Sequence, residues 1–92
     1  MSIEFTKTGP NMVTSTKGFT VVFHPPGGVD YSDTSGSAVH VDTELYATPL
    51  RHVLYAKSKD LRGMTSARAD EILGGILRAM AYLGHPAEIF KE

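Results

Sequence analysis

Four histidines and a closely spaced pair of carboxylates are the residues of this chain best suited to chemistry. Three histidines on neighbouring strands can bind zinc even where cysteine is absent. The intervals between the histidines are sixteen, twelve and thirty-three residues, which match no short metal-binding motif. We expect the histidines to occupy strand or loop positions exposed to solvent and to bind neither a metal nor a cofactor. They are His24, His40, His52 and His85.

Asp42 and Glu44 lie two residues apart in a segment that we predict to be a strand, so their side chains share one face. Such a pair can act as general acid and general base, although it also occurs on ordinary solvated strand faces. The chain has no Gly-x-Ser-x-Gly elbow. Its Pro-Pro-Gly-Gly segment at 25–28 lacks the Gly-Lys-Ser/Thr ending of a phosphate-binding loop. We predict that the protein is not an enzyme.

The composition is typical of one small globular domain, which we assign to residues 1–92. Apolar residues make up 41% of the chain and charged residues 21%, which are ordinary values. Because cysteine is absent, the chain has neither a disulfide nor a reactive thiolate. We find no signal-peptide pattern and no apolar run long enough to span a membrane. We therefore expect a cytoplasmic protein without membrane contact.

The charged residues are unevenly distributed along the chain. Residues 18–50 hold four acidic residues and no lysine or arginine, whereas residues 51–68 hold five basic residues and one acidic residue. Such blocks can steer a charged partner, or they can pair with each other across neighbouring strands. The basic residues could also bind nucleic acid, with Tyr46 and Tyr55 as stacking surfaces, but the isoelectric point near 6.4 makes this unlikely by composition. The basic residues are Arg51, Lys57, Lys59, Arg62 and Arg68.

The segment 65–83 is predicted to be the helix that positions the other elements. Its apolar residues recur every three or four positions and so fall on one stripe of a helix. Thr65 or Ser66 can cap the start, and Gly84 followed by Pro86 can end the helix. We expect a charge at Ile76 or Leu77 to unfold the domain. The apolar stripe consists of Ala69, Ile72, Leu73, Ile76, Leu77, Met80 and Leu83.

The rest of the chain is predicted to form strands and turns. Phe19, Val21 and Phe23 alternate with more polar residues, so we expect these three side chains to face the helix. We predict an α+β fold: an antiparallel meander of about five or six strands, one helix on one face, and a short closing strand. If the closing strand pairs with 51–57, that pairing is parallel. The strand candidates are 3–6, 12–16, 19–24, 29–31, 38–45, 51–57 and 87–90.

Two features leave their interpretation open. Ala67, Gly74 and Ala81 recur every seven residues on the predicted helix, next to Gly75. Small residues let another backbone approach closely, so this stripe could meet a loop or a partner, or it could simply face solvent. The terminal strand could extend the sheet of a second copy or accept a strand from another protein.

The second half of the chain resembles a family of small immunity proteins that are paired with polymorphic or contact-dependent bacterial toxins. The resemblance covers the strand segments at 39–45 and 53–58, the capped helix with Arg68 and the Leu83-Gly84 ending, and the closing Ala-Glu-Ile at 87–89. It implies a β-meander, one helix and a terminal strand. It also implies a cytosolic protein that neutralises the toxin of a sibling cell.

If the resemblance holds, the function is occlusion of the active or substrate-binding site of a cognate toxin. Many such toxins are nucleases with basic grooves, to which an inhibitor would present acidic residues. Tyrosines among those acids could act as aromatic anchors. The alternative is a small nucleic-acid-binding or regulatory domain that uses the basic segment 51–68. The predicted partner-binding residues are Asp30, Tyr31, Asp33, Asp42, Glu44 and Tyr46.

Overall fold

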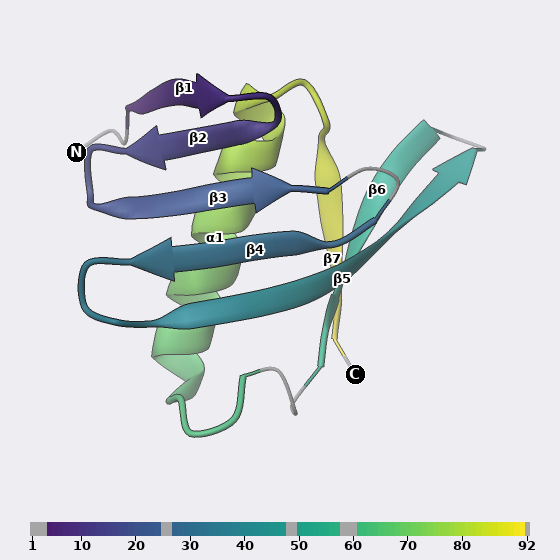
Figure 1. Cartoon of the computed structure of the whole chain (residues 1–92). Helices are drawn as coiled ribbons and strands as arrows, with labels where there is room; N and C mark the ends of the chain where they lie inside the picture. The colour runs from purple at the N-terminus through teal and green to yellow at the C-terminus, as the bar shows by residue number, and fades with distance from the viewer. Residues whose placement is uncertain (1–3, 25–26, 48–49, 58–60, 92) are drawn as a thin grey trace.

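The part of the chain that the structure describes forms seven strands and one helix, shown in Figure 1. The computed structural model describes residues 4–24, 27–47, 50–57 and 61–91. The elements are β1 (Phe5–Gly9), β2 (Met12–Ser15), β3 (Phe19–Phe23), β4 (Val29–Asp33), β5 (Ala38–Ala47), β6 (Leu50–Ala56), α1 (Ser66–Tyr82) and β7 (Ala87–Lys91).

The strands form one sheet in the order of the sequence, from β1 to β7. Neighbouring strands are antiparallel as far as β6, and β7 then pairs with β6 in parallel. The predicted α+β meander with one helix and a closing strand is therefore confirmed. The sheet is larger than expected because β4 is a full strand, paired with both β3 and β5.

The sheet has one face that packs against α1 and one face that does not. In Figure 1, α1 lies behind β1–β4, while the long strand β5 leads from this front layer to β6 and β7. We call the side facing α1 the inner face and the opposite side the outer face. Among the described residues, no helix covers the outer face. α1 itself is not long and apolar enough to cross a lipid bilayer.

The core lies between α1 and the inner face. Phe19, Val21 and Phe23 are buried there, as their alternation predicts. From the helix, Ile72, Ile76 and Met80 are completely buried. Leu77 is only partly buried at the edge of this core, so we expect a charge there to have a smaller effect than a charge at Ile76.

The ends of α1 are formed by the residues predicted to cap it. Thr65 Oγ1 accepts a hydrogen bond from the Arg68 backbone N–H at 3.1 Å. At the other end, Gly84 has a φ of 86°, which an L-residue with a side chain rarely adopts. The Gly84 N–H donates to Ala81 O and the His85 N–H donates to Met80 O, which together form a Schellman ending.

Of the two adjacent glycines in α1, only Gly75 is explained by packing. A Cβ atom on Gly75 would lie 3.0 Å from the ring of Phe19, so the absence of a side chain lets this ring approach the helix. A Cβ on Gly74 would meet nothing within 4 Å. Ala67 and Ala81 are exposed. The small-residue stripe therefore contacts no loop within the part of the chain that the structure describes.

Candidate functional site

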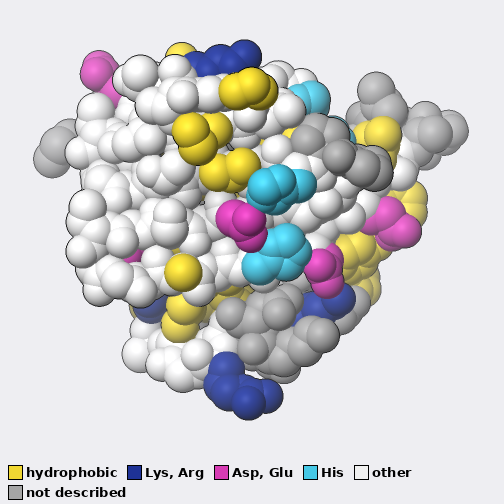
Figure 2. Space-filling view, viewed as in Figure 1, with side chains coloured by type: hydrophobic (Ala, Val, Ile, Leu, Met, Phe, Trp, Pro, Cys, Tyr) yellow, Lys and Arg dark blue, Asp and Glu magenta, His cyan; other side chains and the backbone are white. Residues whose placement is uncertain are grey.

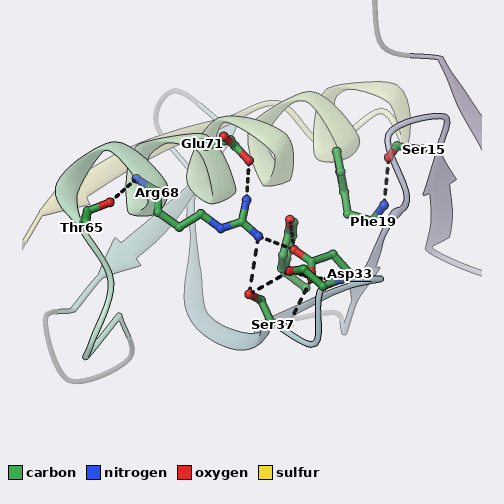
Figure 3. A network of polar contacts seen from close by, with 9 residues as sticks. Ser15, Phe19, Asp33, Ser37, Thr65, Arg68 and Glu71 are labelled. Atoms are coloured by element: carbon green, nitrogen blue, oxygen red, sulfur yellow. Dashed lines mark hydrogen bonds and ion pairs between the residues drawn. The ribbon is translucent and has the colours of Figure 1, made fainter.

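A cleft of about 500 Å³ lies between α1 and the turns that flank β3 and β4. Asp33 lines this cleft, and the polar contacts drawn in Figure 3 converge on its side chain. The Asp33 carboxylate accepts hydrogen bonds from the Tyr31 hydroxyl at 2.9 Å and from the Ser35 hydroxyl at 2.6 Å. The backbone N–H groups of Ser35 and Ser37 donate to the same carboxylate. Arg68 forms an ion pair with Asp33 and another with Glu71.

The hydrogen bonds in this cleft move the pKa values of its groups away from neutrality. The hydrogen bond from the Ser35 side chain, followed by those from Tyr31 and the Ser37 backbone, holds the pKa of Asp33 well below its usual range. Burial, followed by the hydrogen bond to Asp33, raises the pKa of Tyr31 to about 12. General acid–base catalysis needs a pKa near the working pH. The pKa values of Asp33 and Tyr31 do not meet this requirement. Their contacts with Arg68 instead join the end of β4 to the first turns of α1.

Two of the six predicted partner-binding residues lie in this cleft rather than on an open surface. Tyr31 is buried against Phe19, with ring centroids 5.3 Å apart. The side chain of Asp33 is only 8% exposed and is held by Arg68. Both side chains therefore present little surface for a partner to contact.

The other four residues lie on the outer face, where a polar row crosses the strands. His24 Nε2 lies 2.8 Å from one Asp30 oxygen, and His40 Nδ1 lies 2.6 Å from the other. His40 also approaches Asp42 at 3.4 Å, and Asp42 accepts a hydrogen bond from Lys57 at 2.6 Å. Figure 2 shows histidine and acidic side chains alternating on this face. We call these five residues the polar row.

The pairings in the polar row set the charge of its members. The hydrogen bond with His40, followed by that with His24, lowers the pKa of Asp30. The same bond with Asp30 raises the pKa of His40. Lys57, followed by His40, lowers the pKa of Asp42, so Asp42 is not poised to act as a general acid at neutral pH. Within the described residues, no three histidine, aspartate or glutamate side chains converge in a way that could hold a metal ion.

Next to the polar row, aromatic side chains line the outer face of β5–β7. Tyr46 and Tyr55 both donate hydrogen bonds to Glu44, and their hydroxyl oxygens lie 2.7 Å apart. These bonds, first the one from Tyr55, lower the pKa of Glu44. The ring of Phe90 meets that of Tyr55 edge to face, with centroids 5.9 Å apart. We call Tyr46, Tyr55 and Phe90 the aromatic shelf.

The remaining two histidines are not exposed as expected. His52 on β6 and His85 after α1 are half-buried, and each packs against the ring of Phe23. The centroids of the two imidazole rings are 5.2 Å apart. Burial, followed by the proximity of His85, lowers the pKa of His52. The physical reason for the difference is that His52 lies on the inner face of β6, opposite the end of β3.

The basic segment 51–68 does not form one positive surface among the described residues. Arg51 pairs with Glu88 at 3.2 Å and Lys57 pairs with Asp42, both on the outer face. Arg68 lies in the cleft on the other side of the sheet. Lys59 lies outside the described residues. These pairings fit the interpretation that opposite charges meet within the protein.

Several residues of the outer face were missed by sequence reasoning. The sequence predicts exposed positions for His24 and His40 but does not indicate their pairing with Asp30, and it indicates Phe90 only as part of a strand. Their proximity depends on the pairing of β4 with β5 and of β6 with β7. Alternation along each strand could have placed Asp30 and Tyr31 on opposite faces.

Comparisons with protein-family models, with curated proteins and with solved structures find no match for this chain.

Proposed function

We propose that the protein is an immunity-type inhibitor, which binds a cognate bacterial toxin in the cytoplasm and occludes its active or substrate-binding site. The observation that supports this most directly is the outer face. It lacks a covering helix among the described residues and combines exposed carboxylates with the exposed aromatic rings of Tyr46 and Phe90. Interfaces rely on aromatic anchors of this kind, surrounded by polar groups.

The carboxylates of the outer face are already held in place before a partner arrives. Asp30 is bonded to two histidines, Asp42 to Lys57, and Glu44 to two tyrosines. Each of the three still presents surface to solvent. Side chains that are ordered in the free protein lose less entropy on binding. A toxin with a basic substrate groove, such as a nuclease, would suit this face electrostatically.

The resemblance to immunity proteins supplies the class of partner. The meander, single helix and closing strand that it implies agree with the observed fold. A fold can host many functions, so the assignment depends on the partner itself.

The test is capture of the toxin by the tagged full chain from the source cells, followed by measurement of toxin activity. We expect a toxin to be captured and to be inhibited at a one-to-one ratio. Replacing Asp42 and Glu44 together by lysine should weaken binding by about tenfold or more and flatten its salt dependence. Glu4→Lys makes the same kind of charge change just before β1, at the opposite edge of the sheet from β7, and should bind normally.

Circular dichroism of each variant checks that the change leaves the fold intact. Failure to capture a toxin, or unchanged affinity in the folded double variant, would contradict the proposal.

A further inference from the structure

A small hollow of about 220 Å³ lies among the residues of the aromatic shelf. Val53 forms its floor. The side chain of Val53 points to the outer face, because its register partners are Glu44 and Glu88, yet it is only 7% exposed. It is not part of the main core under α1. Val53 is therefore buried by the side chains that surround the hollow.

The walls of the hollow are aromatic, and their positions are fixed. Tyr46 is 40% exposed and Phe90 is 55% exposed, which is unusual for large apolar side chains. The bonds of Tyr46 and Tyr55 to Glu44 hold two of the rings. The guanidinium of Arg51 lies 5.1 Å from the centroid of the Tyr46 ring and pairs with Glu88. The hollow is therefore formed in the free protein.

The size and the charges of the hollow indicate what it can hold. Sites for drug-sized ligands usually have volumes of about 300–1,000 Å³, so this hollow is small for a metabolite. It suits one large apolar side chain. Glu88 and Arg51, which pair with each other, line the hollow, and the Glu44 carboxylate is bonded to the hydroxyls of its two tyrosines. This group of residues has one more carboxylate than cations. That balance favours a cationic neighbour next to the inserted side chain.

We infer that this hollow receives a single aromatic or long aliphatic side chain of the partner protein, flanked in the partner by a lysine or arginine. The inference deepens the proposed function and rests on it for the identity of the partner. The rings of Tyr46 and Phe90 enclose the inserted side chain, and Glu44 and Glu88 pair with the flanking cation. The hollow is then the anchor point of the interface, and the polar row orients the partner around it.

The test is a nuclear magnetic resonance titration of the isotope-labelled full chain with three blocked tripeptides: Lys-Phe-Lys, Lys-Ala-Lys and Glu-Phe-Glu. We expect saturable shifts of the Tyr46, Val53, Tyr55 and Phe90 amides with Lys-Phe-Lys. Glu-Phe-Glu should bind at least fivefold more weakly, and Lys-Ala-Lys should not saturate. Equal behaviour of the three peptides, or shifts confined to the cleft beside α1, would overturn the inference.

Phe90→Ala removes one wall of the hollow and should weaken Lys-Phe-Lys binding by at least tenfold. Tyr82→Ala is the matched control, because Tyr82 is 53% exposed but lies at the end of α1. Its binding should be unchanged. Capture of a toxin that binds Phe90→Ala normally would disprove the hollow and leave the proposed function standing. Binding of Lys-Phe-Lys without capture of any toxin would support the hollow as a binding site and contradict the proposed function.

Discussion

Asp33 is the side chain on which the polar contacts of the inner face converge. It receives hydrogen bonds from the turn that follows β4, from Tyr31 on the same strand, and from Arg68 on α1. A single carboxylate therefore connects the end of β4 and the turn after it to α1, where Arg68 lies 35 residues further along the chain. Because these donors favour the ionised form, the folded state holds the pKa of Asp33 well below that of an unfolded chain.

Asp33 should make the protein sensitive to acid. An aspartate in an unfolded chain titrates near pH 3.9. Since its pKa is lower in the folded state, its contribution to stability is complete above that value and is lost as the pH falls further. Asp33→Asn should lower the melting temperature at pH 7 and make acid unfolding below about pH 4 less steep. A pH series of melting curves measures both; an unchanged acid transition would show that the contacts do not stabilise the charge.

Two of the histidines, His40 and His52, respond to acid in opposite ways. His40 is bonded to Asp30, which favours its protonated form and raises its pKa. His52 is half-buried beside His85 and the ring of Phe23, which favours its neutral form and lowers its pKa. The contribution of His40 is complete below the unfolded pKa of about 6.5 and is lost as the pH rises through the higher folded value. The contribution of His52 is present above about 6.5 and is lost as the pH falls toward the lower folded value.

Replacing these two histidines should therefore change the pH dependence of stability in opposite directions. His52→Phe keeps a ring against Phe23 and should reduce the loss of stability between about pH 7 and pH 5. His40→Gln removes a group that stabilises the protonated side of this range and should increase that loss. Urea midpoints measured at several pH values compare the two variants. A common direction of change in both would contradict the assignment.

At the scale of the elements, α1 shows how one helix serves the core and the cleft together. Its buried stripe packs on β3 and β4, while Gly75 admits Phe19 and Gly74 borders the cleft. Adjacent glycines each cost a helix about 1 kcal/mol relative to alanine. The packing of Phe19 explains why position 75 is glycine, whereas nothing in the structure explains why position 74 is.

The two glycines can be separated by a matched pair of substitutions. Gly74→Ala meets open space and should stabilise the protein by up to about 1 kcal/mol. Gly75→Ala places a methyl group 3.0 Å from Phe19, whose ring is already stacked on Tyr31 and cannot easily withdraw. We expect this variant to be less stable than Gly74→Ala. Equal denaturation midpoints for the two variants would mean that the Phe19 ring moves freely to make room for the added methyl group.

A charge on the buried stripe should have a larger effect than a charge at its edge. Ile76→Asp puts an unpaired carboxylate among apolar side chains and should unfold the protein. Leu77 is partly buried, so Leu77→Asp should weaken the fold without abolishing it. Circular dichroism distinguishes the two outcomes. A folded Ile76→Asp variant would place the core elsewhere.

The elements could be predicted largely because their signals are local. Thr65, Gly84 and the apolar spacing define α1 within one stretch of chain, and alternation defines β3. The segment that became β4 was predicted to be short, because most of its residues are polar. Asp30 and Ser32 point outward, and the two neighbouring strands supply the hydrogen bonds that make β4 regular.

At the scale of the molecule, the candidate site could be predicted only in part. The acidic block included Asp30, Asp42 and Glu44, which lie together on the outer face, but it also included Tyr31 and Asp33, which point to the inner face. The hollow could not be predicted. It combines Tyr46, Val53 and Phe90 from three strands, and Phe90 is brought to the others by a parallel pairing that no local pattern specifies.

One property of β5 has a consequence for how the molecule opens. Residues 38–41 of this strand pair only with β4, and residues 42–47 pair only with β6. No residue of β5 is therefore a register partner on both sides, and the sheet is two ladders joined end to end. Local unfolding follows such divisions. In hydrogen–deuterium exchange, the β2–β4 amides should form one cooperative unit and those of β6–β7 another, with the boundary between Val41 and Asp42.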